Sequence, residues 1–184
     1  VFHLAGQPFV PDSWRDPWDT FEKNVRGQLN ILQMAIETVP QARILVVGSN
    51  EEYGLVSPED LPIDENTALR PYNPYGVSKL AQDMLGLQYY LSHRLHTVRV
   101  RPFNHIGPRQ SERFVTAAFA KQIAEIEMGL KPPVVKVGNL RAKRDFIDVR
   151  DVARAYYLAL TAGQPGQVYN IGSGQARHIQ ELLD

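Results

Sequence analysis

Short apolar runs alternate with amphipathic segments along most of this chain, and this alternation constrains the fold more than any other feature. Five apolar runs predict strands, at residues 1–5, 42–49, 96–103, 133–138 and 167–174. Four longer segments, with apolar residues three and four positions apart, predict helices at 16–39, 75–94, 112–129 and 149–163. Strands separated by helices favour βαβ units, so we predict an α/β fold with a mostly parallel sheet.

Composition excludes several classes of protein. Lys+Arg and Asp+Glu both number 20, a balance that gives no indication of binding to nucleic acid or to an anionic membrane. No cysteine is present, which excludes disulfides, thiolate metal sites and cysteine nucleophiles. His93 and His96 have no third ligand nearby, so we expect no metal site. No apolar run could span a bilayer and no secretory signal opens the chain, so we expect a cytoplasmic enzyme.

Polar segments rich in Gly and Pro follow four of the predicted strands. They read GQPF after the first strand, GSNEEYG after the second, PFNHIGPRQ after the third and GNLRAKRDF after the fourth. Open α/β sheets bind ligands outside the carboxyl ends of their strands. Any one segment could be an ordinary turn, but four in one chain predict a binding site at that end of the sheet.

Tyr75 and Lys79 lie four positions apart and therefore share one face of a predicted helix. The pair alone also fits a surface helix, since this spacing arises often by chance. A neighbouring ammonium is expected to lower the pKa of a tyrosine below its usual value of about 10. With Ser49 ending the preceding strand, the three suit hydride transfer at a sugar ketone or alcohol. Tyr75 would transfer the proton, Lys79 would tune it and hold the cofactor ribose, and Ser49 would orient the carbonyl.

Seven motifs occur in order across nearly the whole chain: HLAGQ, NVRGQLNIL, GSNEEYG, NPYGVSK, RPFNHIGPRQ, KRDFIDVRDVARA and VYNIGSG. In this ordered set the chain resembles the extended short-chain dehydrogenases/reductases of the NAD-dependent epimerase/dehydratase family, which act on nucleotide sugars. Within that family it looks most like the GDP-4-keto-6-deoxymannose reductases, which form GDP-rhamnose with a nicotinamide cofactor. The resemblance implies a Rossmann-type sheet with a small C-terminal substrate lobe.

The resemblance also implies roles for residues, by their positions in these motifs. Ser49, Tyr75 and Lys79 match the catalytic set, and Glu51 matches the general base of related dehydratases. Cofactor contacts are implied for Tyr75, Lys79, Leu4, Ala5, Pro102 and Phe103, with NADP or NAD as the cofactor. Substrate contacts are implied for Asn104, Arg109, Lys121, Asn139, Leu140 and Arg144. We interpret Glu52 as a solvated turn residue.

The family's Gly-rich dinucleotide loop and the residue that distinguishes NAD from NADP are absent from this sequence. By family order, residue 1 falls in the fourth strand. We therefore expect residues 1–184 to be one truncated domain of a longer enzyme. Residues 1–110 would be the remainder of the dinucleotide-binding sheet and 111–184 an interleaved substrate-binding part. The first strand would expose an unpaired edge.

Three functions remain open. The first is NAD(P)H-dependent reduction of the 4-keto group of GDP-4-keto-6-deoxymannose, with Tyr75 as general acid. The second is a GDP-mannose 4,6-dehydratase or a nucleotide-sugar epimerase on the same scaffold. Asn50 replaces an acid that some dehydratases carry, which favours the reductase without excluding the others. The third is a sugar-nucleotide-binding fragment without catalysis. Because the family often forms dimers, we also expect a homodimer through helices 16–39 and 75–94.

Overall fold

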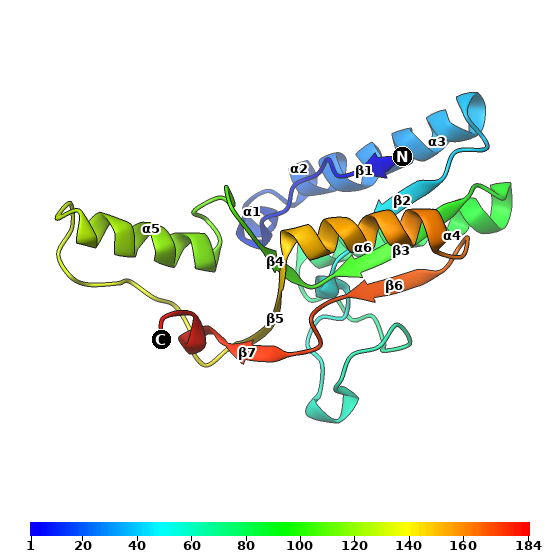
Figure 1. Cartoon of the computed structure of the whole chain (residues 1–184). Coiled ribbons are helices and arrows are strands. Elements are labelled where there is room, and N and C mark those ends of the chain that lie inside the picture. The colour runs from blue at the N-terminus through cyan, green and yellow to red at the C-terminus, as the bar shows by residue number, and fades with distance from the viewer. The chain divides into compact units, whose positions relative to one another are not determined.

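The structure, a computed structural model, describes all 184 residues, which form two compact units (Figure 1). The first unit comprises Val1–Phe103 and Val152–Ile171, and the second comprises Asn104–Asp151 and Gly172–Asp184. No helix in the chain is both long enough and apolar enough to cross a bilayer. The first unit contains the predicted catalytic residues, and the second contains the predicted substrate contacts.

The first unit is built on a parallel sheet of four strands. In spatial order these are β1 (Phe2–His3), β2 (Ile44–Val47), β3 (Thr97–Pro102) and β6 (Val168–Ile171). The two central strands are almost entirely buried. The predicted α/β fold with a mostly parallel sheet is therefore confirmed, as are the strands expected over 42–49, 96–103 and 167–174.

The first strand differs from its prediction. We expected a buried strand over residues 1–5, but β1 is two residues long and Phe2 is 45% exposed. The reason is its place in the sheet, because β1 pairs with β2 on one side only. The expectation of an exposed edge at this strand is met.

Helices cover both faces of this sheet. The elements α1 (Val10–Arg15), α2 (Pro17–Phe21), a π-helical turn (Glu22–Arg26) and α3 (Gly27–Thr38) come before β2. Helix α4 (Pro74–His93) comes before β3, and α6 (Val149–Ala162) comes before β6. A core cluster joins α3, β2 and α4 on one face, formed by Leu32, Ala35, Ile44, Val46, Tyr89 and Leu95. Helix α6 lies over the opposite face (Figure 1), where its C-terminal end approaches Val98.

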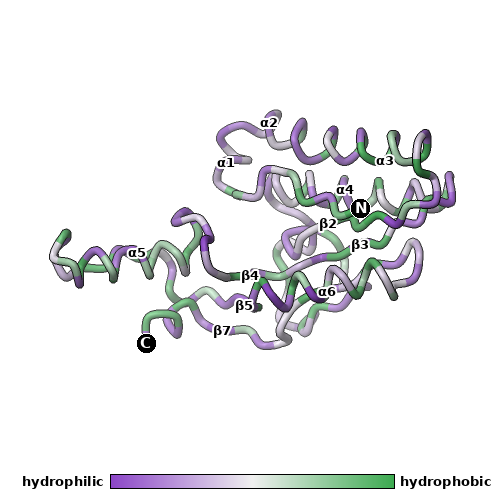
Figure 2. The backbone as a smooth tube through the Cα atoms, turned by 45° about the horizontal axis from the view of Figure 1, so that its top comes forward, coloured by the Kyte–Doolittle hydropathy of each residue, from purple (hydrophilic) through white to green (hydrophobic).

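The helix predicted over 16–39 is confirmed, but a wider π-helical turn interrupts it. Asp16 caps its start by accepting the Asp19 N–H at 2.9 Å, and Pro17 occupies the first helical position. The tube over α1, α2 and the π-helical turn is mostly hydrophilic (Figure 2). Four polar residues of α1 to α3 are nevertheless fully buried, namely Ser13, Thr20, Asn24 and Gln28. Buried polar groups need partners, and those of Asn24 connect it to the site described below.

The second unit holds a separate sheet of three strands. They are β4 (Asn104–Ile106), β5 (Lys143–Asp148) and β7 (Ala176–His178), in the order β4-β5-β7. Strands β4 and β5 are parallel, whereas β5 and β7 are antiparallel. Helix α5 (Val115–Glu127) lies between β4 and β5 in the chain. The helices predicted over 75–94, 112–129 and 149–163 are thus all confirmed.

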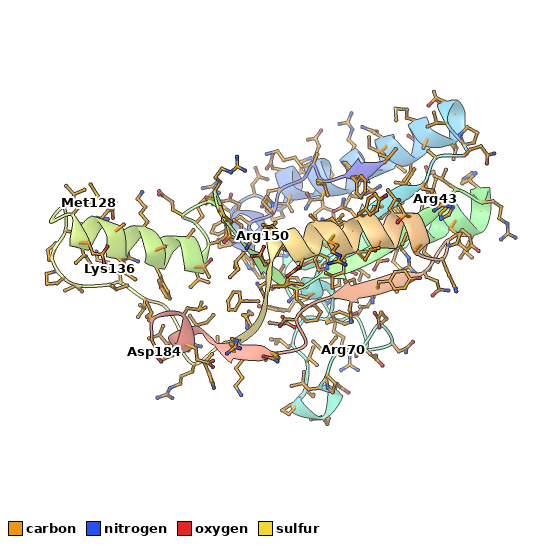
Figure 3. All side chains as sticks on the ribbon, in the orientation of Figure 1. Arg43, Arg70, Met128, Lys136, Arg150 and Asp184 are labelled. Atoms are coloured by element: carbon orange, nitrogen blue, oxygen red, sulfur yellow. The ribbon has the colours of Figure 1, made fainter.

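The strand predicted over 133–138 is wrong. No neighbouring strand pairs with this segment, and the backbone of Lys136 bonds instead to the side chain of Gln122 in α5, at 2.8 and 3.1 Å. Figure 3 labels Lys136 beside that helix. The segment GNLRAKRDF therefore does not follow a strand, and β5 begins inside it. The apolar pattern does not predict β5, because its sequence, KRDFID, carries charges where a buried strand would be apolar.

Candidate active site

Ser49 is placed by a short turn at the carboxyl end of β2. The turn is a 3₁₀ helix, Asn50–Glu52, with Ser49 as its N-cap. The Ser49 hydroxyl accepts the Glu51 N–H at 3.2 Å, and the Ser49 N–H donates to Glu52 Oε1 at 2.7 Å. Gly48 makes room for this arrangement, since a Cβ there would lie 2.1 Å from Glu52 Oε1.

Tyr75 and Lys79 are placed by the first two turns of α4. Asn73 caps the helix by accepting the Gly76 N–H at 2.7 Å. The same side chain donates to Glu51 Oε2 at 2.8 Å, which ties the helix to the Ser49 turn. The two segments touch so closely that a Cβ on Gly76 would lie 2.7 Å from the Glu51 carbonyl oxygen. The four predicted catalytic residues, Ser49, Glu51, Tyr75 and Lys79, are thereby brought together within the first unit.

The Tyr75 phenol is held in its protonated form. Burial raises the pKa of Tyr75 to about 12, while a hydrogen bond with Ser49 lowers it in part and the charge of Glu51 raises it further. The expectation that Lys79 lowers the pKa of Tyr75 is not met, because burial is the largest effect and the hydrogen bond with Ser49 is what opposes it. The hydrogen bond indicates that the Ser49 hydroxyl lies beside the phenol.

Lys79 is held by a buried amide. Its Nζ donates to Gln82 Oε1 at 2.9 Å, and Gln82 in turn donates to Gln28 Oε1 at 3.5 Å. Burial lowers the pKa of Lys79 to about 8, against the opposing charge of Glu52. An ammonium has three hydrogens to donate, and the structure gives this one a single protein acceptor. Lys79 therefore keeps donors for a ligand.

A buried cluster of four ionisable side chains, Glu52, Asp83, Arg99 and Arg101, adjoins the Ser49 turn. Asp83 of α4 bonds to Arg99 at 2.5 Å and to Arg101 Nε at 2.7 Å. Glu52 bonds to the same Arg101 Nε at 3.1 Å and is fully buried, so its interpretation as a solvated turn residue is wrong. The sequence does carry a signal for this cluster, because Arg99 and Arg101 lie in a strand that is otherwise predicted to be buried. Buried cations need acidic partners.

Asn24, in the π-helical turn, joins the segment after β1 to the catalytic helix. Its Oδ1 accepts the Gln7 N–H at 2.7 Å, and its Nδ2 donates to the Gln7 carbonyl at 3.2 Å. The same Nδ2 donates at 2.9 Å to Ser78, whose hydroxyl donates to the Tyr75 carbonyl at 2.7 Å. π-helical turns often occur at functional sites, and this one connects two segments predicted to contact the cofactor.

Four predicted cofactor contacts of the first unit lie at carboxyl ends of strands, while Tyr75 and Lys79 lie on α4. Leu4 and Ala5 follow β1, and both are exposed, Leu4 to 65%. Pro102 is the buried last residue of β3, and the Phe103 N–H donates to the Ile171 carbonyl at 2.8 Å. With Ser49 after β2, the ends of three adjacent strands carry candidate site residues, as the sheet rule predicts.

The second unit contains a cavity of about 240 Å³. It is lined by residues of β4, α5, β5 and the segments around them, namely Asn104, Val115, Phe119, Gly138, Asn139, Ala142, Arg144, Phe146 and Ile179. Three predicted substrate contacts, Asn104, Asn139 and Arg144, are among them. Asn104 Oδ1 is buried without a hydrogen-bond partner, so it is available to a donor group of a ligand.

Three other predicted substrate contacts do not line this cavity. Arg109 is exposed and has a left-handed backbone, with φ of 69°. Lys121 is exposed on α5 and paired with Glu112. The Leu140 carbonyl accepts the Gln180 N–H at 3.1 Å.

Comparison with known proteins assigns the family. The sequence model described as GDP-mannose 4,6 dehydratase matches residues 1–184. GDP-6-deoxy-D-mannose reductase of Pseudomonas aeruginosa is 44% identical over all of this chain and 60% of its own length. The GDP-mannose 4,6-dehydratase sdnI of Sordaria araneosa is 30% identical over all of this chain and 34% of its own. The chain thus spans about 60% or less of these two relatives.

Solved structures agree with this assignment. The structure of RMD from Pseudomonas aeruginosa complexed with NADPH matches with a TM-score of 0.95 and 44% identity, over 98% of this chain and 61% of that one. The UDP-glucose 4-epimerase of Thermus thermophilus, in complex with NAD, matches with a TM-score of 0.86 and 32% identity, over 100% of this chain and 59% of that one. The chain therefore belongs to the GDP-mannose 4,6-dehydratase family, within the extended short-chain dehydrogenases/reductases that its motifs resemble.

Proposed function

We propose that the full-length protein reduces the 4-keto group of GDP-4-keto-6-deoxymannose to give GDP-rhamnose, with a nicotinamide cofactor. The observation that carries this proposal is the protonated phenol of Tyr75 beside the Ser49 hydroxyl, one helical turn before Lys79. The 44% identity to a GDP-6-deoxy-D-mannose reductase supports the choice of substrate.

The chain's own residues would handle the carbonyl oxygen. The Ser49 hydroxyl donates a hydrogen bond to that oxygen and fixes its direction. A reduced nicotinamide, when bound, supplies the hydride that adds to the carbonyl carbon. Tyr75 gives its phenolic proton to the oxygen as negative charge develops there, so the product is an alcohol and Tyr75 is left as a phenolate. Solvent then returns the proton to Tyr75.

The residues present fit a nicotinamide cofactor. Lys79 keeps ammonium donors for a ribose, since Gln82 is its one protein acceptor. Leu4 and Ala5 present exposed apolar surface at the end of β1. The matched structures named above hold NADPH or NAD, and we propose NADP or NAD for this protein.

The cavity of the second unit fits part of an anionic, hydrogen-bonding ligand. Arg144 brings a guanidinium to its wall, a group suited to phosphate oxygens. The unpartnered oxygen of Asn104 needs a donor, which the base or sugar of a nucleotide sugar can supply. We therefore propose that Asn104, Asn139 and Arg144 bind the substrate in this cavity, and that Arg109, Lys121 and Leu140 contact it outside the cavity. The similarity to the reductase supports a GDP-linked substrate.

Glu51 favours a dehydratase as the second candidate. Its charge raises the pKa of Tyr75, so its carboxylate belongs to the surroundings of the phenol, and a carboxylate can serve as a general base. One of its oxygens is occupied by Asn73. A dehydratase or an epimerase would return the hydride to the sugar and leave the cofactor unchanged, which separates both from a reductase.

The test is to give the purified full-length protein GDP-4-keto-6-deoxymannose with NADPH or NADH and to follow oxidation of the cofactor. We expect stoichiometric oxidation and a product that NMR identifies as GDP-rhamnose. GDP-mannose serves as the matched second substrate, and its conversion to a keto product without net cofactor oxidation would establish the dehydratase instead. Binding of GDP-sugars with turnover of neither substrate would leave a non-catalytic binding protein.

We also propose a homodimer through helices 16–39 and 75–94. Large apolar side chains stand exposed along α1 to α4, including Trp14, Trp18, Met34, Val77, Met84 and Leu91. Helices α3 and α4 share one core cluster, and their exposed apolar residues offer surface to a partner copy. Sedimentation equilibrium is expected to give twice the monomer mass, and replacement of Trp18, which is 79% exposed, by Glu is expected to shift the protein toward monomer. A wild-type protein that sediments as a monomer at micromolar concentration would contradict this.

A further inference from the structure

Glu52 fixes the backbone of Ser49 through a buried hydrogen bond. Its side chain is fully buried, and its Oε1 accepts the Ser49 N–H at 2.7 Å. Because the Ser49 hydroxyl is itself fixed on the following turn, a shift of the Ser49 backbone would move the hydroxyl away from Tyr75. Nothing in the proposed reaction assigns a task to Glu52, although it is closer to Ser49 than any other acidic group of the cluster.

Glu52 and Asp83 share one donor, the Nε of Arg101, and Asp83 has a second cation, Arg99, at 2.5 Å. Arg101 has a single hydrogen on Nε, and that atom lies 3.1 Å from Glu52 Oε2 and 2.7 Å from Asp83 Oδ2. The other contacts of Arg101 go to the Tyr53 hydroxyl and the Glu65 carbonyl, not to a carboxylate. Two fully buried carboxyl groups therefore face each other across one N–H. Such a pair is relieved when one member carries a proton.

We propose that Glu52 is a positioning residue for Ser49, and that it acts as a neutral acid whose proton is shared with Asp83. The effect of Glu52 on turnover rests on the proposed function. Its hydrogen bond to Ser49 and its protonation state do not. A neutral Glu52 still accepts the Ser49 N–H through Oε1 and donates its own proton toward Asp83.

The electrostatic surroundings of Glu52 support this protonation state. Burial, and then the charge and hydrogen bond of Asp83, raise the pKa of Glu52 against the opposing charge of Arg101 and the N–H of Ser49. The charge of Glu52 also acts on Tyr75 and Lys79 of helix α4. An ionised Glu52 would oppose the negative charge that forms on Tyr75 during the reaction. The neutral form removes that opposition.

The first readout does not depend on activity. Hydrogen exchange of the Ser49 amide is measured by NMR in the full-length protein, in the wild type and in the Glu52→Gln, Glu52→Leu and Glu59→Leu variants. Gln reproduces the neutral acid, Leu removes the acceptor, and Glu59 is an exposed acid in a neighbouring 3₁₀ turn that serves as control. We expect slow exchange in the wild type, Glu52→Gln and Glu59→Leu, and exchange at least tenfold faster in Glu52→Leu. Equal protection in all four would overturn the proposal.

The second readout is stability against pH, which tests the protonation state. A carboxyl whose pKa is raised on folding binds more protons in the folded than in the unfolded state, so stability falls as pH rises above about 4.3 toward the folded value. The Glu52→Gln variant has no proton to lose. Because burial and Asp83 raise the pKa of Glu52 to about 9, we expect the unfolding midpoint of this variant to decline less than that of the wild type between about pH 5 and pH 9. A parallel decline in both proteins would show that Glu52 is already ionised.

The third readout is kinetic and separates positioning from a general structural role. We expect Glu52→Leu to lower kcat by about 10- to 100-fold with little change in KM, and Glu52→Gln to stay within about threefold of the wild type. In a Ser49→Ala background, adding Glu52→Leu should lower kcat almost no further, because Glu52 acts through Ser49. Additive losses, or a Gln variant as impaired as Leu, would refute the proposal. A wild type without reductase activity would reject the proposed function while leaving the first two readouts intact.

Discussion

Replacement of Tyr75 by Phe is expected to lower kcat for keto reduction by about 10²- to 10⁴-fold, the range supplied by a positioned general acid. The change removes one hydroxyl, which is the group that would protonate the carbonyl oxygen. The ring remains, so packing at the start of α4 is preserved. Because the pKa of Tyr75 is raised to about 12, the wild-type phenol carries its proton throughout the neutral range. The measurement is steady-state cofactor oxidation with the full-length protein.

Tyr72 supplies the matched control for this substitution. It lies three residues before Tyr75, precedes α4 and is 50% exposed. The Tyr72→Phe variant should retain wild-type kcat, and both variants should give the same far-ultraviolet circular dichroism. If Tyr75→Phe keeps kcat within threefold of the wild type, Tyr75 is not the proton donor and the proposed mechanism fails.

Replacement of Asp83 by Ala is expected to destabilise the protein by about 3–5 kcal/mol, the usual cost of removing one partner from a buried ion pair. Asp83 is 1% exposed and bonds to both Arg99 and Arg101, which are themselves buried. Its loss would leave Arg99 without a carboxylate partner and Arg101 with Glu52 alone. The free energy of unfolding from urea titration is the quantity to compare.

An exposed ion pair provides the contrast. Asp19 bonds to Lys23 one helical turn away, and both side chains are well exposed. Replacement of Asp19 by Ala is expected to lower the free energy of unfolding by about 0.5 kcal/mol or less, as is typical of surface ion pairs. A loss below about 1 kcal/mol for Asp83→Ala would mean that the cluster is hydrated or rearranges, contrary to its burial here.

The sequence was sufficient for those parts of the molecule that depend on local pattern. The run ILVV could only be a buried strand in this context, and it became β2. The spacing of Tyr75 and Lys79 placed both on one helix, and the break after β2 placed Ser49 beside them. These inferences needed only periodicity and the rule that sites lie at carboxyl ends of parallel strands.

Features that depend on distant partners could not be read in the same way. A glutamate in a turn is usually solvated, and Glu52 is buried only because Arg101 approaches it from another strand. Residues 133–138 have the composition of a strand but find no strand to pair with, so the Gln122 amide takes their backbone groups. The wider turn at Glu22–Arg26 leaves no clear mark in a pattern of apolar residues.

The arginine at the centre of the buried cluster has a consequence for the order in which this protein forms. Arg101 contacts Tyr53, and the Tyr53 hydroxyl donates to Asn170 at 2.7 Å, so the turn that begins at Ser49 is connected to the last strand of its sheet. Chains are made from the N-terminus, and contacts between residues far apart in sequence form late. While the ribosome is still adding the residues of α6, the Ser49 turn lacks part of its support. The catalytic geometry is therefore completed only after α6 has been made, when residue 170 joins the sheet.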